Sequence, residues 1–104
     1  MKVSKMSDYP KHIAGKKLDQ LTLDDCVFLT LRKGRFMMFH EIQEVIKNTT
    51  RKFYGLPTIS ASIRNMRKDY ARKQYELHPY KEVIEKRRRG KGYEYKLHIG
   101  GIDE

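Results

Sequence analysis

The chain has 104 residues and a formal net charge of +10, with 38% hydrophobic and 35% charged residues. This length allows one domain with a modest core, and the apolar fraction is too high for a chain that stays disordered. No apolar run approaches the roughly 20 residues of a membrane span and the N-terminal residues lack the apolar stretch of a secretory signal, so we expect a cytoplasmic protein without a membrane partner.

The positive charge is concentrated in the second half of the chain. Residues 1–50 carry nine Lys and Arg against six Asp and Glu, whereas residues 51–96 carry fourteen against five, a net +9. Such a concentration favours a polyanionic partner, with nucleic acid first and an anionic membrane surface second. A solvated basic surface that only keeps a small protein soluble is the alternative that composition leaves open.

The chain begins with a polar stretch and continues into a strongly patterned helix. Residues 1–21 have no clear hydrophobic period and are expected to form a flexible or loosely docked arm. The next helix is predicted to start after Thr22, a good N-cap residue, and to stop at Gly34. Cys26 is the only cysteine, which excludes an internal disulfide, and its apolar neighbours predict a buried packing residue.

The next segment combines a short extended piece with a second helix. Residues 35–38 are too few for a helix and are expected to form a brief strand. From Phe39 onward, the spacing of Ile42, Val45 and the next apolar residue predicts an amphipathic helix. Residues 48–55 are then expected to be a turn-rich connection.

A third helix is predicted over residues 58–72, with Thr58 as its N-cap. An apolar stripe at helical spacing would face the core and contains Ile59, Ile63, Met66 and Tyr70. The opposite side would carry small, amide and cationic residues, namely Ser60, Ala61, Arg64, Asn65, Lys68 and Arg72. A face with so few acids is unlike the mixed surface of an ordinary solvated helix.

Beyond Pro79 the hydrophobic period changes to two, which predicts a β-hairpin over residues 83–99. Its turn would contain Gly90, Lys91 and Gly92, and Tyr95 and Leu97 are expected to be core residues. The predicted tip carries five cations, namely Lys86, Arg87, Arg88, Arg89 and Lys91. Residues 100–104 are expected to be a flexible tail.

In this order of elements the sequence resembles the winged helix-turn-helix DNA-binding family. The segments that carry the resemblance are MMFHEIQEVI for the second helix, TISASIRNMRK for the recognition helix and VIEKRRRGKGYEYKL for the wing. It looks in particular like the small winged-helix proteins of bacteriophages and prophages. The resemblance covers about residues 22–99 and implies an α+β fold of three helices, a C-terminal hairpin wing and a short strand between the first two helices.

The resemblance implies a DNA-binding protein, a phage-type transcriptional regulator or DNA accessory factor that acts in the bacterial host cytoplasm. Arg64 suits the O6 and N7 atoms of guanine, and Asn65 suits the N6 and N7 atoms of adenine, in a major groove that admits a helix. Thr58 and Ser60 would lie near phosphates, while Lys68 and Arg72 would contact the backbone. The wing cations would lie on the backbone or enter the minor groove, with Arg88, Arg89 and Lys91 as the best candidates.

Other partners and activities are left open or disfavoured. RNA, or a host protein in a phage–host complex, is the alternative partner for the same fold, and a homodimer is left open. The four histidines and the lone cysteine have no metal-ligand spacing, and the chain has neither a carboxylate cluster suited to metals nor a nucleotide-binding phosphate loop. We therefore expect no enzyme, no metal and no cofactor.

Overall fold

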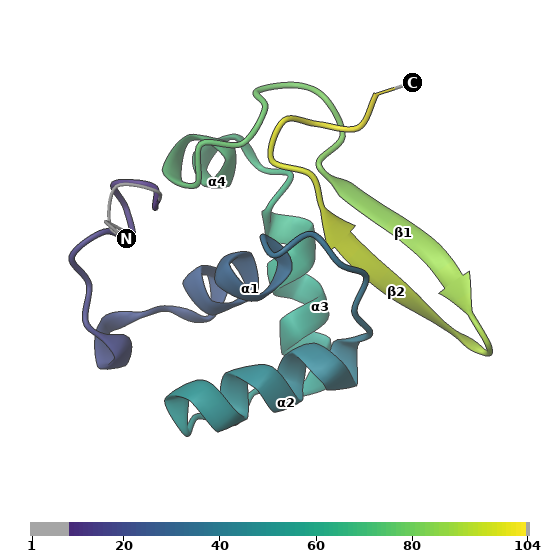
Figure 1. Cartoon of the computed structure of the whole chain (residues 1–104), viewed down its shortest axis with the longest axis horizontal. Coiled ribbons are helices and arrows are strands. Elements are labelled where there is room, and N and C mark those ends of the chain that lie inside the picture. Colours follow the sequence, from purple (N-terminus) through teal and green to yellow (C-terminus); the bar gives the residue numbers. More distant parts are fainter. Residues whose placement is uncertain (1–8, 104) are drawn as a thin grey trace, which may run out of the picture.

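The computed structural model describes residues 9–103 (Figure 1). Its elements are a short 3-10 helix η2 (Leu18–Gln20), the helices α1 (Leu23–Leu31), α2 (Phe39–Thr50), α3 (Leu56–Asn65) and α4 (Asp69–Gln74), and the strands β1 (Ile84–Arg89) and β2 (Gly92–Leu97). The two strands pair antiparallel as one hairpin, so the predicted α+β class is confirmed. No helix within the described range is long and apolar enough to cross a membrane.

Helix α1 begins where the sequence predicts, because Thr22 and Asp25 form a capping box. The Thr22 Oγ1 atom accepts a hydrogen bond from the Asp25 amide at 3.1 Å, and the Asp25 carboxylate accepts one from the Thr22 amide at 3.0 Å. The chain leaves the helix through Gly34, whose φ of 83° lies in the left-handed region that glycine tolerates. The expected start and stop of this helix are therefore both confirmed.

Helix α2 begins at Phe39 as predicted but is longer than the sequence suggested. Residues 48–50, which were expected to belong to the connection, continue the helix to Thr50. The Thr50 hydroxyl donates to the Ile46 carbonyl oxygen, one helical turn earlier, at 2.8 Å. Arg51 ends the helix with a left-handed φ of 65°, so the connection to α3 contains only residues 51–55.

The predicted third helix is two helices. It starts earlier than expected, with Gly55 rather than Thr58 as the N-cap. It also stops at Asn65, because residues 66–68 tighten into a turn in which the Met66 amide donates to Ile63 and the Lys68 amide to Asn65. The prediction of one helix over residues 58–72 is therefore wrong.

The break between α3 and α4 changes which aromatic residue enters the core. Tyr70, which the apolar stripe had included, is 46% exposed, whereas Tyr75 is buried and stacks on Phe28. The core lies where α1, α2 and α3 meet and extends under the base of the hairpin, with Cys26 buried among apolar side chains as expected. Burial raises the pKa of the Cys26 thiol, so it behaves as a packing residue.

The hairpin joins the helices through its second strand. The predicted strand at residues 35–38 is reduced to a single antiparallel bridge, in which Met37 and Tyr95 exchange two backbone hydrogen bonds of 2.8 Å. Leu97 is buried and Tyr95 is partly buried, with its ring stacked on Phe39 at a centroid distance of 4.7 Å. These contacts hold the base of the hairpin against α2, while its far end extends away from the helices (Figure 1).

A fully buried carboxylate connects the N-terminal segment, α1 and α4. Asp25 is 0% exposed and accepts hydrogen bonds from Lys16 Nζ at 2.7 Å and from the Tyr75 hydroxyl at 2.6 Å. Burial alone would raise the pKa of Asp25, but the hydrogen bonds from Lys16, Tyr75 and the Thr22 amide outweigh it and lower the pKa below its ordinary value. Burial, and then the hydrogen bond to Asp25, raise the pKa of the Tyr75 hydroxyl.

Both ends of the described chain make contacts with the helical body or the hairpin. Ile13, from the segment expected to be a flexible arm, is buried in the core. Near the C-terminus, the Ile102 amide donates to the Glu82 carbonyl oxygen at 2.8 Å. Residues 1–8 of the predicted arm and residue 104 of the predicted tail lie outside the described residues, and the flexibility of both segments stays a prediction.

We expect the Asp25 network to make stability depend on pH in the acid range. Because the folded-state pKa of Asp25 is depressed, its contribution is present above its unfolded pKa near 3.8 and is lost as the pH falls through the folded value. Asp25→Asn should lower the free energy of unfolding at pH 7 by about 1–3 kcal/mol, because it leaves buried partners poorly satisfied. It should also flatten the loss of stability as the pH falls below about 3.8.

Urea unfolding at a series of pH values measures both effects. Asp19→Asn provides the matched control, because Asp19 lies on the exposed 3-10 helix η2 and undergoes the same chemical change. Equal pH dependence of the Asp25→Asn variant and the wild-type protein over this range would contradict the assignment.

Candidate nucleic-acid interface

Helix α3 buries one side and exposes another that carries no acid. Ile59, Ser62 and Ile63 are buried, and the Ser62 hydroxyl donates to the Asp24 carboxylate of α1. This contact fixes the rotation of α3, which lies behind α1 in the view of Figure 1. Because side chains three or four residues apart share a helix face, the remaining positions form one outward surface. The predicted site residues on this surface are Thr58, Ser60, Ala61, Arg64 and Asn65, of which Thr58 and Arg64 are exposed.

The guanidinium of Arg64 is held along this outward surface. Its Nη1 atom donates to the Ser60 Oγ atom one helical turn earlier, at 2.9 Å. The side chain is therefore directed toward the N-terminal end of α3, and the remaining donors of the guanidinium stay available for a ligand. Both partners were predicted site residues, and the structure brings them into direct contact.

Two residues of the predicted recognition surface do not lie on α3. Lys68 is the exposed N-cap residue of α4, and Arg72 lies within α4. The Arg72 Nη1 atom donates to the carbonyl oxygens of His78 and Lys81, both at 2.7 Å, and its Nε atom donates to the Arg67 carbonyl oxygen at 2.8 Å. Arg72 therefore holds α4 against the segment that leads into the hairpin, and its donors are not directed toward a ligand.

The register of the hairpin divides its cations between two faces. Arg89 pairs with Gly92, Arg88 with Tyr93 and Arg87 with Glu94, so Gly90 and Lys91 form a two-residue turn. Gly90 has a φ of 59°, as such tight turns require. Directly paired residues project on the same side of a sheet. Lys86 and Arg88 therefore share a face with Tyr93, whereas Arg87 and Arg89 share the other face with Glu94.

The face of Arg87 and Arg89 is paired with acids. Glu94 is only 6% exposed and accepts a hydrogen bond from the Arg87 Nε atom. The Arg89 Nη1 atom lies 3.4 Å from Glu94 and 3.2 Å from Glu41 at the start of α2. The sequence could have predicted the Arg87–Glu94 ion pair, because counting outward from a Gly90-Lys91 turn places Arg87 opposite Glu94.

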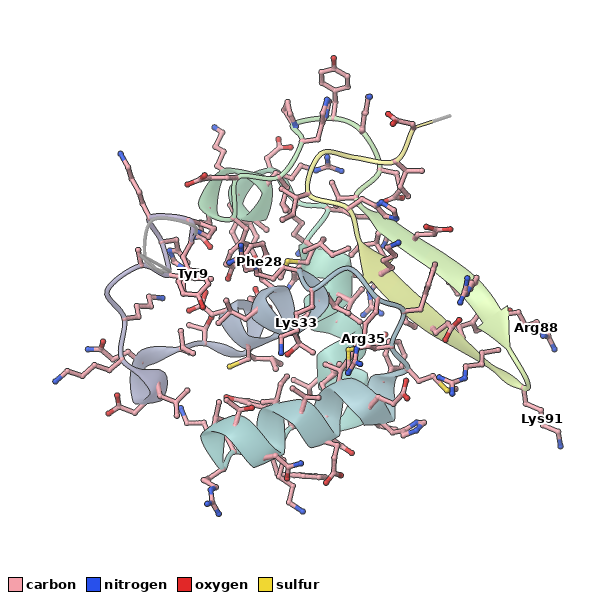
Figure 2. All side chains as sticks on the ribbon, in the orientation of Figure 1. Tyr9, Phe28, Lys33, Arg35, Arg88 and Lys91 are labelled. Carbon is pink, nitrogen blue, oxygen red and sulfur yellow. The ribbon has the colours of Figure 1, made fainter. Side chains whose placement is uncertain are left out.

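The other cations of the hairpin tip lie near an aromatic ring or in the turn. Lys86 Nζ lies 4.2 Å from the centre of the Tyr93 ring, and the Arg88 guanidinium lies 6.0 Å from the same ring. Figure 2 shows Arg88 and Lys91 at the outer end of the hairpin, with the Lys91 side chain projecting away from the strands. Within residues 9–103, none of the ion pairs with acidic side chains involves Lys86, Arg88 or Lys91.

The α2–α3 connection contains two cations that were not predicted as site residues. Arg51 and Lys52 are exposed and directly precede the turn into α3. Their position between the second and third predicted helices could have indicated a role in the site. Among the described residues, no group of three or more His, Cys, Asp or Glu side chains could hold a metal ion.

Comparison with known proteins adds no family assignment. A scan against protein-family models and searches of curated proteins and of solved structures found no match to this chain.

We expect Arg72 to contribute to stability through its geometry, not only through its charge. Arg72→Lys keeps the charge but cannot reproduce the three hydrogen bonds of a planar guanidinium, so it should lower the free energy of unfolding by about 1–3 kcal/mol. Lys73→Arg, the reverse exchange at the exposed neighbouring position, is the control and should change stability by less than about 0.5 kcal/mol. Equal unfolding midpoints of the two variants in urea would contradict the structural role of Arg72.

Proposed function

We propose that the protein binds double-stranded DNA as a winged helix-turn-helix domain, with α3 in the major groove and the β1–β2 hairpin as the wing. The observation that carries the proposal is the acid-free outward face of α3, with Arg64 directed along it. The order of elements supports the assignment: α1, the extended residue Met37 bonded to β2, then α2, α3 and the hairpin. Helix α4 is an addition between the recognition helix and the wing.

The outward face of α3 has the chemistry that base edges require. Arg64 offers paired donors for the two acceptors of guanine, and Asn65 offers a donor and an acceptor for adenine. Ala61, one helical turn before Arg64 and Asn65, is small enough to let the helix approach the groove closely. Thr58 and Ser60 provide short hydroxyl groups. Base-edge contacts and phosphate contacts can therefore come from one surface.

Basic groups flank this face and provide attraction that does not depend on base sequence. Arg51 and Lys52 precede α3, and Lys91 lies at the tip of the hairpin. Since neutralised phosphates release counterions, such cations give affinity and a strong salt dependence, while α3 gives sequence preference. This separation of general affinity from sequence preference suits a transcriptional regulator or DNA accessory factor of phage type.

Fluorescence anisotropy with two labelled duplexes tests the proposal. One duplex is selected from a random pool by the protein, and the other has random sequence. At moderate salt the selected duplex should bind at least tenfold more tightly. Equal affinity for both duplexes would exclude sequence-specific recognition, and displacement of DNA by structured RNA at the same salt would favour RNA as the partner.

Arg64→Ala should weaken binding to the selected duplex by about 1–3 kcal/mol and relax the base preference at one position. The reason is the loss of a two-donor contact to one base. Lys73→Ala removes the same charge from α4 and is the control, with little expected change in base preference. Both variants are compared on duplexes that differ at single positions. An unchanged preference at every position in Arg64→Ala would show that Arg64 does not read a base.

A further inference from the structure

We propose that the two faces of the hairpin have different tasks, an inference that rests on the proposed DNA binding. Lys86, Arg88 and the Tyr93 hydroxyl bind a phosphodiester of the DNA backbone. Arg87 and Arg89, although they belong to the same run of cations, bind acidic side chains of the protein itself and fix the position of the hairpin.

The pairing register determines which cation belongs to which face. Side chains alternate along β1, so Lys86 and Arg88 project on one side and Arg87 and Arg89 on the other. The first side also carries Ile84 and Leu97, which are buried at the base of the hairpin. The open cations therefore continue, toward the tip, the same face that packs on the helical body.

The second face is neutralised from within the protein. Arg87 bonds to Glu94, and its guanidinium also lies over the Phe36 ring at 3.7 Å from the ring centre. Arg89 lies between Glu94 and Glu41 and so connects the hairpin to the first turn of α2. The carboxylate of Glu94 is nearly buried, so moving Arg87 to a phosphate would leave this carboxylate with only the longer contact to Arg89 at 3.4 Å. This cost keeps both arginines at their present partners.

The first face has no such constraint and offers several donors close together. The Tyr93 side chain is 42% exposed, Lys86 Nζ lies 4.2 Å from its ring centre and the Arg88 guanidinium lies 6.0 Å from it. An ammonium, a guanidinium and a phenol hydroxyl can donate together to the oxygens of one phosphate group. Binding an anion here also relieves the repulsion between two neighbouring cations, so a phosphodiester fits this face better than a neutral ligand does.

Two double variants with equal charge change test the division of tasks. Lys86→Gln/Arg88→Gln and Arg87→Gln/Arg89→Gln each remove two positive charges from the same strand. The logarithm of the affinity for one fixed duplex is measured against the logarithm of the salt concentration. Because Lys86 and Arg88 neutralise one phosphate in this proposal, their loss should flatten this slope by about 0.9. Arg87→Gln/Arg89→Gln should change the slope by less than about 0.5 and should lower the thermal unfolding midpoint.

Equal flattening in both variants, or a larger effect from Arg87→Gln/Arg89→Gln, would overturn the division of tasks while leaving DNA binding in place. A wild-type protein that does not bind duplex DNA would overturn the proposed function as well. The two failures are therefore distinguishable in one titration series.

A pair of variants that remove single hydroxyl groups provides a test without loss of charge. Tyr93→Phe keeps the ring near both cations but loses the donor, so binding should weaken about two- to tenfold. Tyr95→Phe makes the same change on the same face, nearer the helical body, and should leave the affinity unchanged. Equal affinities for Tyr93→Phe and the wild-type protein, or equal losses in both variants, would show that the Tyr93 hydroxyl makes no phosphate contact.

Discussion

The buried carboxylate of Asp25 is the interaction on which the arrangement of the helices depends. It caps α1. It also accepts hydrogen bonds from the hydroxyl of Tyr75, which follows α4, and from the ammonium of Lys16 in the N-terminal segment. A buried charge is tolerated only when its partners are all in place, so these three parts of the chain are fixed together. The neighbouring Asp24 carboxylate accepts the Ser62 hydroxyl and thereby sets the rotation of α3.

The same principle explains the hairpin, where acids are rare and each one is used. Glu94 and Glu41 engage two of the arginines, and this leaves the other cations of the hairpin without an acidic partner within residues 9–103. The net charge of the hairpin is therefore unevenly distributed, although its sequence looks uniformly basic. In the proposed complex, one face would hold the wing in position and the other would contact the DNA backbone.

The sequence correctly predicted those features of the fold that depend on local signals. The Thr22 cap, the Phe39 start of α2 and the change of period near residue 83 depend on neighbouring residues alone, and each is confirmed. The break at residues 66–68 was missed because the helical spacing of apolar residues continues through it to Tyr70. Only the packing of Tyr75 against Phe28 and Asp25 shows why the chain turns there. The long-range partners of Arg72 and Arg89 were equally invisible, since their acceptors come from other elements.

The predicted site residues on α3 depend on helical periodicity, and the structure brings them together as one surface. The part on the hairpin needed the pairing register, because a shift by one residue exchanges every side chain between faces. The basic run alone could not indicate which arginines are neutralised by acids.

Adding duplex DNA to isotope-labelled protein, with the amide resonances followed by NMR, identifies the surface that contacts DNA. We expect the largest shifts on residues 58–65 of α3 and on the Lys86, Arg88 and Tyr93 face of the hairpin. Shifts confined to other surfaces, such as the exposed side of α2 around Glu44 and Asn48, would contradict it. So would a spectrum that the duplex leaves unchanged.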